Sequence, residues 1–201
     1  MKKRIALIGM AVVFAACILV GGTFAWFTDR QEVTNVVTMG NVSVVLNDIY
    51  EGHTVALPSK TVSKIVSVTN DGEQPAYVRI QLKKYWSAYA EDGKQPDGTE
   101  NPELIHINFT NPEDWVLGND GAYYYQKPLE PDVTTSNLFE SFTLDEKIDN
   151  RYDQLQGNIE VSAQAVQSKN FEKQLDKNGE GQIVGWGDVQ VEDNNISPFK
   201  G

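Results

Sequence analysis

Ile159-Glu160-Val161-Ser162-Ala163-Gln164-Ala165 is the stretch that decides the fold class, because apolar and polar residues alternate along it one by one. A period of two places every second side chain on the same face of an extended strand, whereas a helix needs a period near 3.6. The segment therefore predicts a β-strand with one buried face. The same alternation recurs in three other runs: Val42–Asn47, Val78–Lys83 and Ile105–Phe109.

Turn signals separate these runs. Asn70-Asp71-Gly72 follows the expected strand Thr61–Thr69, and Asn119-Asp120-Gly121 precedes Ala122–Gln126. Asp-Gly after Asn suits a tight turn that needs a positive φ. Many short strands with regular turns predict an all-β protein, an antiparallel β-sandwich of jelly-roll type. We expect only minor short helices, near Asp145–Gln154 and Asn170–Leu175.

The N-terminus has the pattern of an export signal. Lys2, Lys3 and Arg4 precede sixteen uncharged residues, Ile5 to Val20, and Thr23-Phe24-Ala25 places small residues before a cut between Ala25 and Trp26. Two alternatives remain open. Ile5 to Phe27 carries no charge over 23 residues, which is long enough to stay in the bilayer as an uncleaved anchor. Phe14-Ala15-Ala16-Cys17 loosely resembles a lipoprotein processing box.

Composition limits the partners and the chemistry of the exported part. Removing residues 1–25 takes away three cations and no acid, so the net charge falls from −11 to −14. Nucleic acids and anionic membrane surfaces would repel such a chain. Cys17, the only cysteine, lies in the signal, so the processed chain can form neither a disulfide nor a thiolate metal site.

The residues Gly-Gly-Thr-Phe-Ala-Trp-Phe-Thr-Asp, from Gly21 to Asp29, resemble the signal end of the TasA and camelysin family of exported Gram-positive surface proteins. Further segments are similar to strands of that family: Met39–Val44, Leu57–Gly72, Pro75–Ile80 and Asn158–Gln167. The resemblance implies a jelly-roll domain, cleavage by a SipW-type signal peptidase and export to the cell surface or the biofilm matrix.

In fibre-forming members of the family, the new N-terminal segment is a donor strand that inserts into the sheet of the next subunit. Here Trp26–Thr38 has no Pro or Gly and carries the apolar residues Trp26, Phe27, Val33, Val36 and Val37. An open sandwich leaves unpaired backbone groups at its edges, which an extended arm can satisfy by strand addition. Backbone hydrogen bonds roughly offset the cost of ordering the arm, so these apolar residues would decide the balance. The alternative is that residues 33–38 pair inside their own domain.

Camelysin-type members have been classed as metallopeptidases, which makes a zinc site the first enzymatic alternative. The chain holds only His53 and His106 and no His-Glu-x-x-His motif, so we expect neither zinc nor catalytic residues. Asp176, Asn178 and Glu180 match early oxygen positions of an EF-hand calcium loop. Position twelve, however, is Gly187 instead of a bidentate glutamate, so calcium remains a weak candidate.

Four segments follow from these arguments: a signal peptide at residues 1–25, a donor-strand candidate at 26–40, a jelly-roll domain at 41–167 and a C-terminal extension at 168–201. We expect an exported structural protein, a biofilm fibre subunit that polymerises with itself by donor-strand exchange and also meets other matrix proteins. A surface metallopeptidase and a monomeric, membrane-anchored adhesion module are the alternatives.

Overall fold

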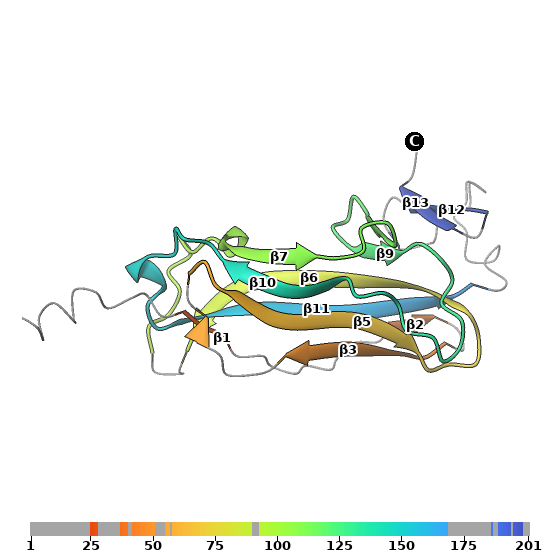
Figure 1. Cartoon of the computed structure of the whole chain (residues 1–201), viewed down its shortest axis with the longest axis horizontal. Helices are drawn as coiled ribbons and strands as arrows, with labels where there is room; N and C mark the ends of the chain where they lie inside the picture. The colour runs from red at the N-terminus through yellow and green to blue at the C-terminus, as the bar shows by residue number, and fades with distance from the viewer. Residues whose placement is uncertain are drawn as a thin grey trace, which may run out of the picture.

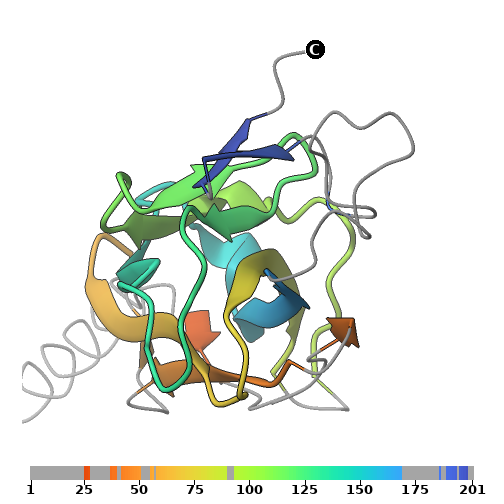
Figure 2. The same ribbon diagram turned by 90° about the vertical axis from the view of Figure 1, so that its right-hand side faces the viewer.

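The computed structural model describes residues 25–27, 37–39, 42–50, 55–56, 58–89, 93–168, 186, 189–193 and 195–198. Within these residues the protein is a β-sandwich of two sheets with a small two-stranded hairpin on one side, as Figures 1 and 2 show. The all-β prediction is therefore confirmed. Three predicted features lie wholly or partly outside the described residues: residues 1–24 of the signal predicted at 1–25, the middle of the donor candidate from Thr28 to Val36, and the calcium candidate.

The larger sheet has seven strands in the order β4-β1-β11-β6-β9-β8, with β2 also paired to β11. The centre of this sheet is the long antiparallel pair of β6 and β11, in register from Leu155↔Ala88 to Gln167↔Ala76. The strands have these bounds: β1 Ala25–Phe27, β2 Val37–Met39, β4 Val55–Ala56, β6 Ala76–Ala88, β8 Trp115–Leu117, β9 Tyr123–Tyr125 and β11 Leu155–Gln167.

The smaller sheet has four antiparallel strands in the order β3-β5-β10-β7. Their bounds are β3 Val44–Tyr50, β5 Thr61–Asn70, β10 Phe139–Leu144 and β7 Ile105–Phe109. A register shift between Phe139 and Ser141 places a bulge at Glu140. Figure 1 shows β7, β10, β5 and β3 one below the next, in front of β6 and β11.

The apolar residues of the predicted strands form the core between the two sheets. Ile159, Val161, Ala163 and Ala165 of β11 are buried, as the alternation predicted. They meet the inward side chains of the smaller sheet, among them Val66, Val68, Phe139, Phe142 and Leu144. Burying side chains of this size contributes about 1.5–3 kcal/mol each to the stability of the fold.

A second, smaller core lies on the outer face of the larger sheet. The hairpin of β12 (Val189–Glu192) and β13 (Asn195–Pro198) covers β8 and β9 there, and Figure 2 shows it over these strands. Ile196 donates its backbone N–H to the carbonyl of Gln126 at 2.7 Å. The cluster comprises Tyr77, Ala122, Tyr124, Val166, Trp186, Val189 and Ile196. The predicted C-terminal extension thus contains a segment that packs onto the sandwich.

The two predicted Asp-Gly turns form for different reasons. Gly121 has a φ of +77°, the positive value that the sequence suggested. Gly72 lacks a positive φ, so that part of the prediction is wrong. Its glycine is required by close approach instead, because a Cβ there would lie 2.8 Å from the backbone nitrogen of Ser43.

Helix is even rarer than expected in the described residues. The predicted helix at Asp145–Gln154 is reduced to one 3-10 turn, η2 (Asn150–Tyr152), capped by the Asp149 side chain. A second turn, η1 (Pro102–Leu104), closes the Gly- and Pro-rich loop before β7. Asn170–Leu175 lies outside the described residues.

Candidate functional site

The edge of β11 opposite β6 is where both described pieces of the donor candidate lie. β1 pairs with β11 in parallel through Trp26↔Gln156 and Phe27↔Gly157. β2 pairs in parallel with the same strand through Val37↔Gln164, Thr38↔Ala165 and Met39↔Val166. The two short strands sit near opposite ends of β11 (Figure 1). Within the single chain, therefore, the arm pairs with its own domain at these two places.

The two pairings are in different registers. Ten residue steps separate Phe27 from Val37, whereas seven separate their partners Gly157 and Gln164. One continuous strand laid along β11 can therefore make only one of the two pairings. Among the described residues, no strand pairs with Asn158–Ala163 on this side of β11. The two described pieces of the arm therefore lie on either side of this central part of the edge.

The donor residues predicted from the sequence are thus partly placed. Trp26 and Phe27 lie in β1 and Val37 lies in β2, while Val33 and Val36 lie outside the described residues. Ala25 and Trp26, which flank the predicted cleavage point, are both within β1. β4 pairs with β1 on its other side through Ala25↔Ala56 and Trp26↔Val55, so β1 sits between two strands.

An ion pair lies inside the sandwich on the strands beside this edge. β3 packs against β11, and its Asp48 carboxylate accepts a hydrogen bond from the Lys64 ammonium of β5 at 2.5 Å. The Lys64 side chain is 3% exposed and that of Asp48 is 20% exposed. The ammonium also lies 5.6 Å from the ring centroid of Tyr50. Each of these two charges compensates the other, whereas either charge alone would be costly to bury.

The sequence carried a signal for this pair. Lys64 falls in the apolar phase of its strand, between Val62 and Val66, and Asp48 falls in phase with Val44 and Leu46. Charges at these positions predict inward side chains, and the pairing of β3 with β5 in the structure makes the two charges partners. Sequence reasoning that looked only for catalytic patterns missed it.

A second charged group lies under the C-terminal hairpin. The Arg79 guanidinium donates from Nε to Gln164 at 2.7 Å, and from an Nη to Tyr124 at 2.9 Å and Asp120 at 3.1 Å. The Tyr124 hydroxyl donates to Asp120 at 2.6 Å. Burial raises the pKa of Tyr124, and its hydrogen bond to Asp120 raises that pKa further. Trp186 covers the group, with its ring centroid 5.1 Å from the guanidinium carbon.

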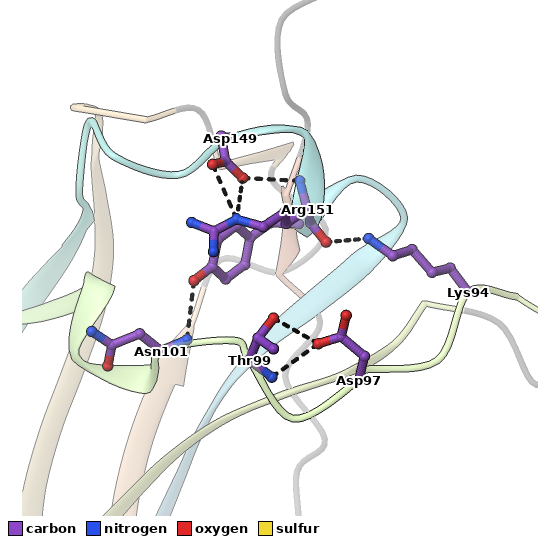
Figure 3. A network of polar contacts seen from close by, with 7 residues as sticks. Lys94, Asp97, Thr99, Asn101, Asp149 and Arg151 are labelled. Carbon is purple, nitrogen blue, oxygen red and sulfur yellow. Dashed lines mark hydrogen bonds and ion pairs between the residues drawn. The ribbon is translucent and has the colours of Figure 1, made fainter.

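A polar network orders the loop at the other end of β6, as Figure 3 shows. Asp97 accepts hydrogen bonds from the side chain and the backbone of Thr99, at 2.6 and 2.9 Å, and these bonds lower its pKa. Asp149 accepts from the side chain and backbone of Arg151, which lowers the pKa of Asp149 in the same way. Lys94 donates to the Arg151 carbonyl.

These carboxylates are used by their own loops. The oxygens of Asp97 and of Asp149 each accept from donors two residues further along the same loop, and the two carboxylates do not converge on a common site. The Asn101 backbone N–H donates to the Tyr152 hydroxyl at 3.0 Å and so joins the two loops. The arrangement stabilises the connection between β6 and η1. It has the geometry of turn and cap chemistry.

Of the metal ligands considered from the sequence, His106 lies in the described residues. His106 contacts Asp145, with 2.7 Å between Nε2 and Oδ2, and the His106 side chain is half exposed. The backbone N–H of Lys147 and then His106 hold the pKa of Asp145 below its usual value. Across the described part of the chain, no group of three or more His, Cys, Asp or Glu side chains converges as metal ligands do. His53, Asp176, Asn178 and Glu180 lie outside it.

Comparison with known proteins gives one match. The family model described as camelysin metallo-endopeptidase matches residues 1–156. No curated protein and no solved structure matches. The matched segment ends at the start of β11, so the rest of that strand, Trp186 and the hairpin lie beyond it. Among the residues that the structure describes, no helix has the length and apolar character needed to cross a bilayer.

Proposed function

The chain belongs to the camelysin metallo-endopeptidase family, and from this premise we propose that it is an exported structural protein of the cell surface or biofilm matrix, whose copies join into fibres by exchanging N-terminal arms. The proposal places the acceptor at the edge of β11 opposite β6. It needs no catalytic residue. A SipW-type signal peptidase would free the arm by cutting between Ala25 and Trp26.

The mismatch of registers along β11 is the observation that supports this proposal most. Among the described residues, the chain's own arm pairs with β11 through β1 and β2, which differ by three residues in register. An arm from a second copy can lie along β11 in a single register and extend the pairing over Asn158–Ala163. Each added backbone hydrogen bond contributes about 0.5–1.5 kcal/mol net. Exchange would therefore add pairing that the described strands of the single chain do not make.

Exchange of this kind conserves most of the contacts that already exist. The departing arm loses its pairing with β11 of its own chain and makes the equivalent pairing in a neighbour, as in domain swapping. Because each copy donates at one end and accepts along β11, the contact is head-to-tail. Head-to-tail contacts produce open filaments unless a ring closes.

Two single-cysteine variants test the exchange directly. In a Cys17→Ala background, one population carries Thr38→Cys and the other Ala165→Cys, the register partners of β2 and β11. Mixed and oxidised, they should form a disulfide-linked heterodimer, because a strand from one copy reaches β11 of the other. Thr38→Cys mixed with Thr99→Cys, a loop position, is the matched control.

A mixture that gives no more heterodimer than this control would overturn the strand exchange, as would disulfides found only when both substitutions are in one chain. Negative-stain electron microscopy of the secreted protein tests the fibre itself. N-terminal sequencing of the same material separates the processed subunit, which should start at Trp26, from a membrane-anchored adhesion module.

The family description makes peptidase activity the second candidate function. The test is cleavage of casein by the purified protein with and without a chelator, together with the zinc content per chain. Chelator-sensitive cleavage with one zinc per chain would favour an enzyme over a purely structural subunit.

A further inference from the structure

The outer face of the four-stranded sheet is nearly uncharged, although the chain carries a net charge of −11. The outward positions of β5, from Thr61 to Thr69, are Thr, Ser, Ile, Ser and Thr. Those of β3, from Val45 to Ile49, are Val, Asn and Ile. β10 adds Ser141 and Thr143, and β7 adds His106 and Asn108. The carboxylate among the residues of these two strands is Glu140, at the bulge.

The outer face of the larger sheet differs in this respect. Its two central strands carry the exposed Lys83, which pairs with Glu160 across them. Charged outward residues are the ordinary means of keeping a sheet face in solvent. The scarcity of charged outward residues on the four-stranded sheet of a strongly acidic protein marks that face as different.

Hydrogen bonds between neighbouring strands order the polar side chains of this face. Asn47 donates to Thr69 at 2.8 Å and to Ser67 at 3.3 Å. Asn108 donates to Ser141 at 3.0 Å and to Thr143 at 3.1 Å. Side chains already held in one geometry lose less conformational entropy when a partner binds. The face is therefore pre-organised for contact.

Apolar side chains lie at the β3 margin of the same face. Ile49 is 58% exposed and Val45 is 43% exposed. Ile49 lies directly opposite Ile65 of β5, so the two form an apolar pair across the strands. Burying such a pair against a partner would add hydrophobic free energy to the hydrogen bonds.

We propose that this face, defined by the outward residues of β3, β5, β10 and β7, is a lateral contact between two copies of this chain. The low charge of the face favours a second copy as the partner, because two acidic molecules repel each other least where neither presents charge. Symmetry supports the same choice. Hydroxyl and amide groups both donate and accept, so such a face can be its own complement in a two-fold contact.

The dimensions indicate a weak contact. Four strands about 4.8 Å apart and about seven residues long, at about 3.4 Å per residue, cover roughly 450 Å². A standard interface buries about 800 Å² on each partner. Single molecules should therefore associate weakly, and several subunits held in one row should associate much more strongly. The contact is independent of arm exchange, because it uses a different sheet.

Cross-linking between identical positions tests the proposal. In the Cys17→Ala background, Ser63→Cys lies on the proposed face and Ser162→Cys lies at an outward position of β11 in the other sheet. Both are serines in the middle of a strand, so they are matched. A short bismaleimide should give at least ten-fold more dimer with Ser63→Cys, after both yields are corrected for labelling by a single maleimide. Equal yields would overturn the proposal.

Charge substitution gives a second, independent readout. Ser63→Glu should abolish the cross-link made through Thr61→Cys, because like charges then meet across the contact. An equimolar mixture of Ser63→Glu and Ser63→Lys should restore it. Failure of the mixture to associate would contradict a self-complementary face. Association that appears only when soluble cell-wall polysaccharide is added would also overturn it, since the partner would then be a glycan.

Discussion

The Trp186 ring lies against the Arg79 guanidinium, with 5.1 Å between the ring centroid and the guanidinium carbon, and both side chains are buried. Arg79 belongs to β6 in the centre of the larger sheet, and Trp186 precedes the C-terminal hairpin. A cation held over an indole in a partly desolvated place contributes up to about 2 kcal/mol. This contact fixes the hairpin to the sandwich.

We expect Trp186→Ala to release the hairpin. Removing a buried tryptophan costs about 3–5 kcal/mol, which exceeds what one hairpin with a few hydrogen bonds can replace. The backbone amide of Ile196 should then lose its hydrogen-exchange protection, and limited proteolysis should cut the C-terminal segment first. Leu117→Ala, at a side chain that is 57% exposed, is the control and should change neither measurement. Unchanged protection in Trp186→Ala would mean that another contact holds the hairpin.

Lys64→Met should destabilise the protein by about 2 kcal/mol, because it removes the Lys64 ammonium that donates to the Asp48 carboxylate inside the sandwich. The partial exposure of Asp48, 20%, keeps the cost below that of a fully buried charge. Urea denaturation measures it. The double variant Lys64→Met/Asp48→Leu should recover most of the loss, and Lys60→Met, at an exposed lysine, should stay within about 0.5 kcal/mol of wild type. If Lys64→Met leaves the free energy of unfolding unchanged, water already solvates Asp48.

Acid should weaken the loops that Asp97, Asp145 and Asp149 order. Hydrogen bonds lower the pKa of each carboxyl in the folded state. Their contribution is therefore present above the unfolded value near 3.9 and is lost as the pH falls through the lower folded pKa.

The melting temperature of Asp145→Asn should accordingly lie below that of wild type at neutral pH and converge with it below about pH 3–4. Thermal melts monitored by circular dichroism across this range give the comparison. Lys147→Ala is the matched control, since the backbone N–H that Asp145 accepts from remains in place. A gap that stays constant down to pH 2 would assign the effect to something other than titration.

Alkali should act on three tyrosines, the buried Tyr77 and Tyr124 and the partly buried Tyr123. Burial raises the pKa of Tyr77, Tyr123 and Tyr124 above the ordinary value near 10. A raised folded pKa contributes stability that is complete below the unfolded value and is lost as the pH rises beyond it. We expect these phenols to ionise only as the protein unfolds, which absorbance near 295 nm can follow.

Tyr124→Phe separates hydrogen bonding from titration. The variant removes the hydroxyl that joins Arg79 and Asp120, so it should cost about 1–2 kcal/mol at neutral pH. It should also flatten the loss of stability above about pH 10, because one titrating group is gone. An unchanged alkaline slope would indicate that Tyr124 does not contribute to it.

Several parts of the structure were predictable from neighbouring residues. The alternation in Ile159–Ala165 predicted both the β11 strand and its buried side, because strand geometry itself places every second side chain on one face. The Gly121 turn was predictable for the same local reason. The pairing of β1 and β2 with β11 was only one of two open alternatives, because an extended arm satisfies its backbone equally well in its own sheet or in a neighbour's.

The sequence by itself determined the strands, their inward faces and the family, since these depend on local periodicity and on residues read in order. Only the tertiary structure decided that Arg79, outward on its strand, is buried under Trp186, and that Lys64 meets Asp48 inside the sandwich. Both outcomes depend on which distant segment covers a given face. That choice is made by the packing of the whole chain, through contacts between residues that no local pattern connects.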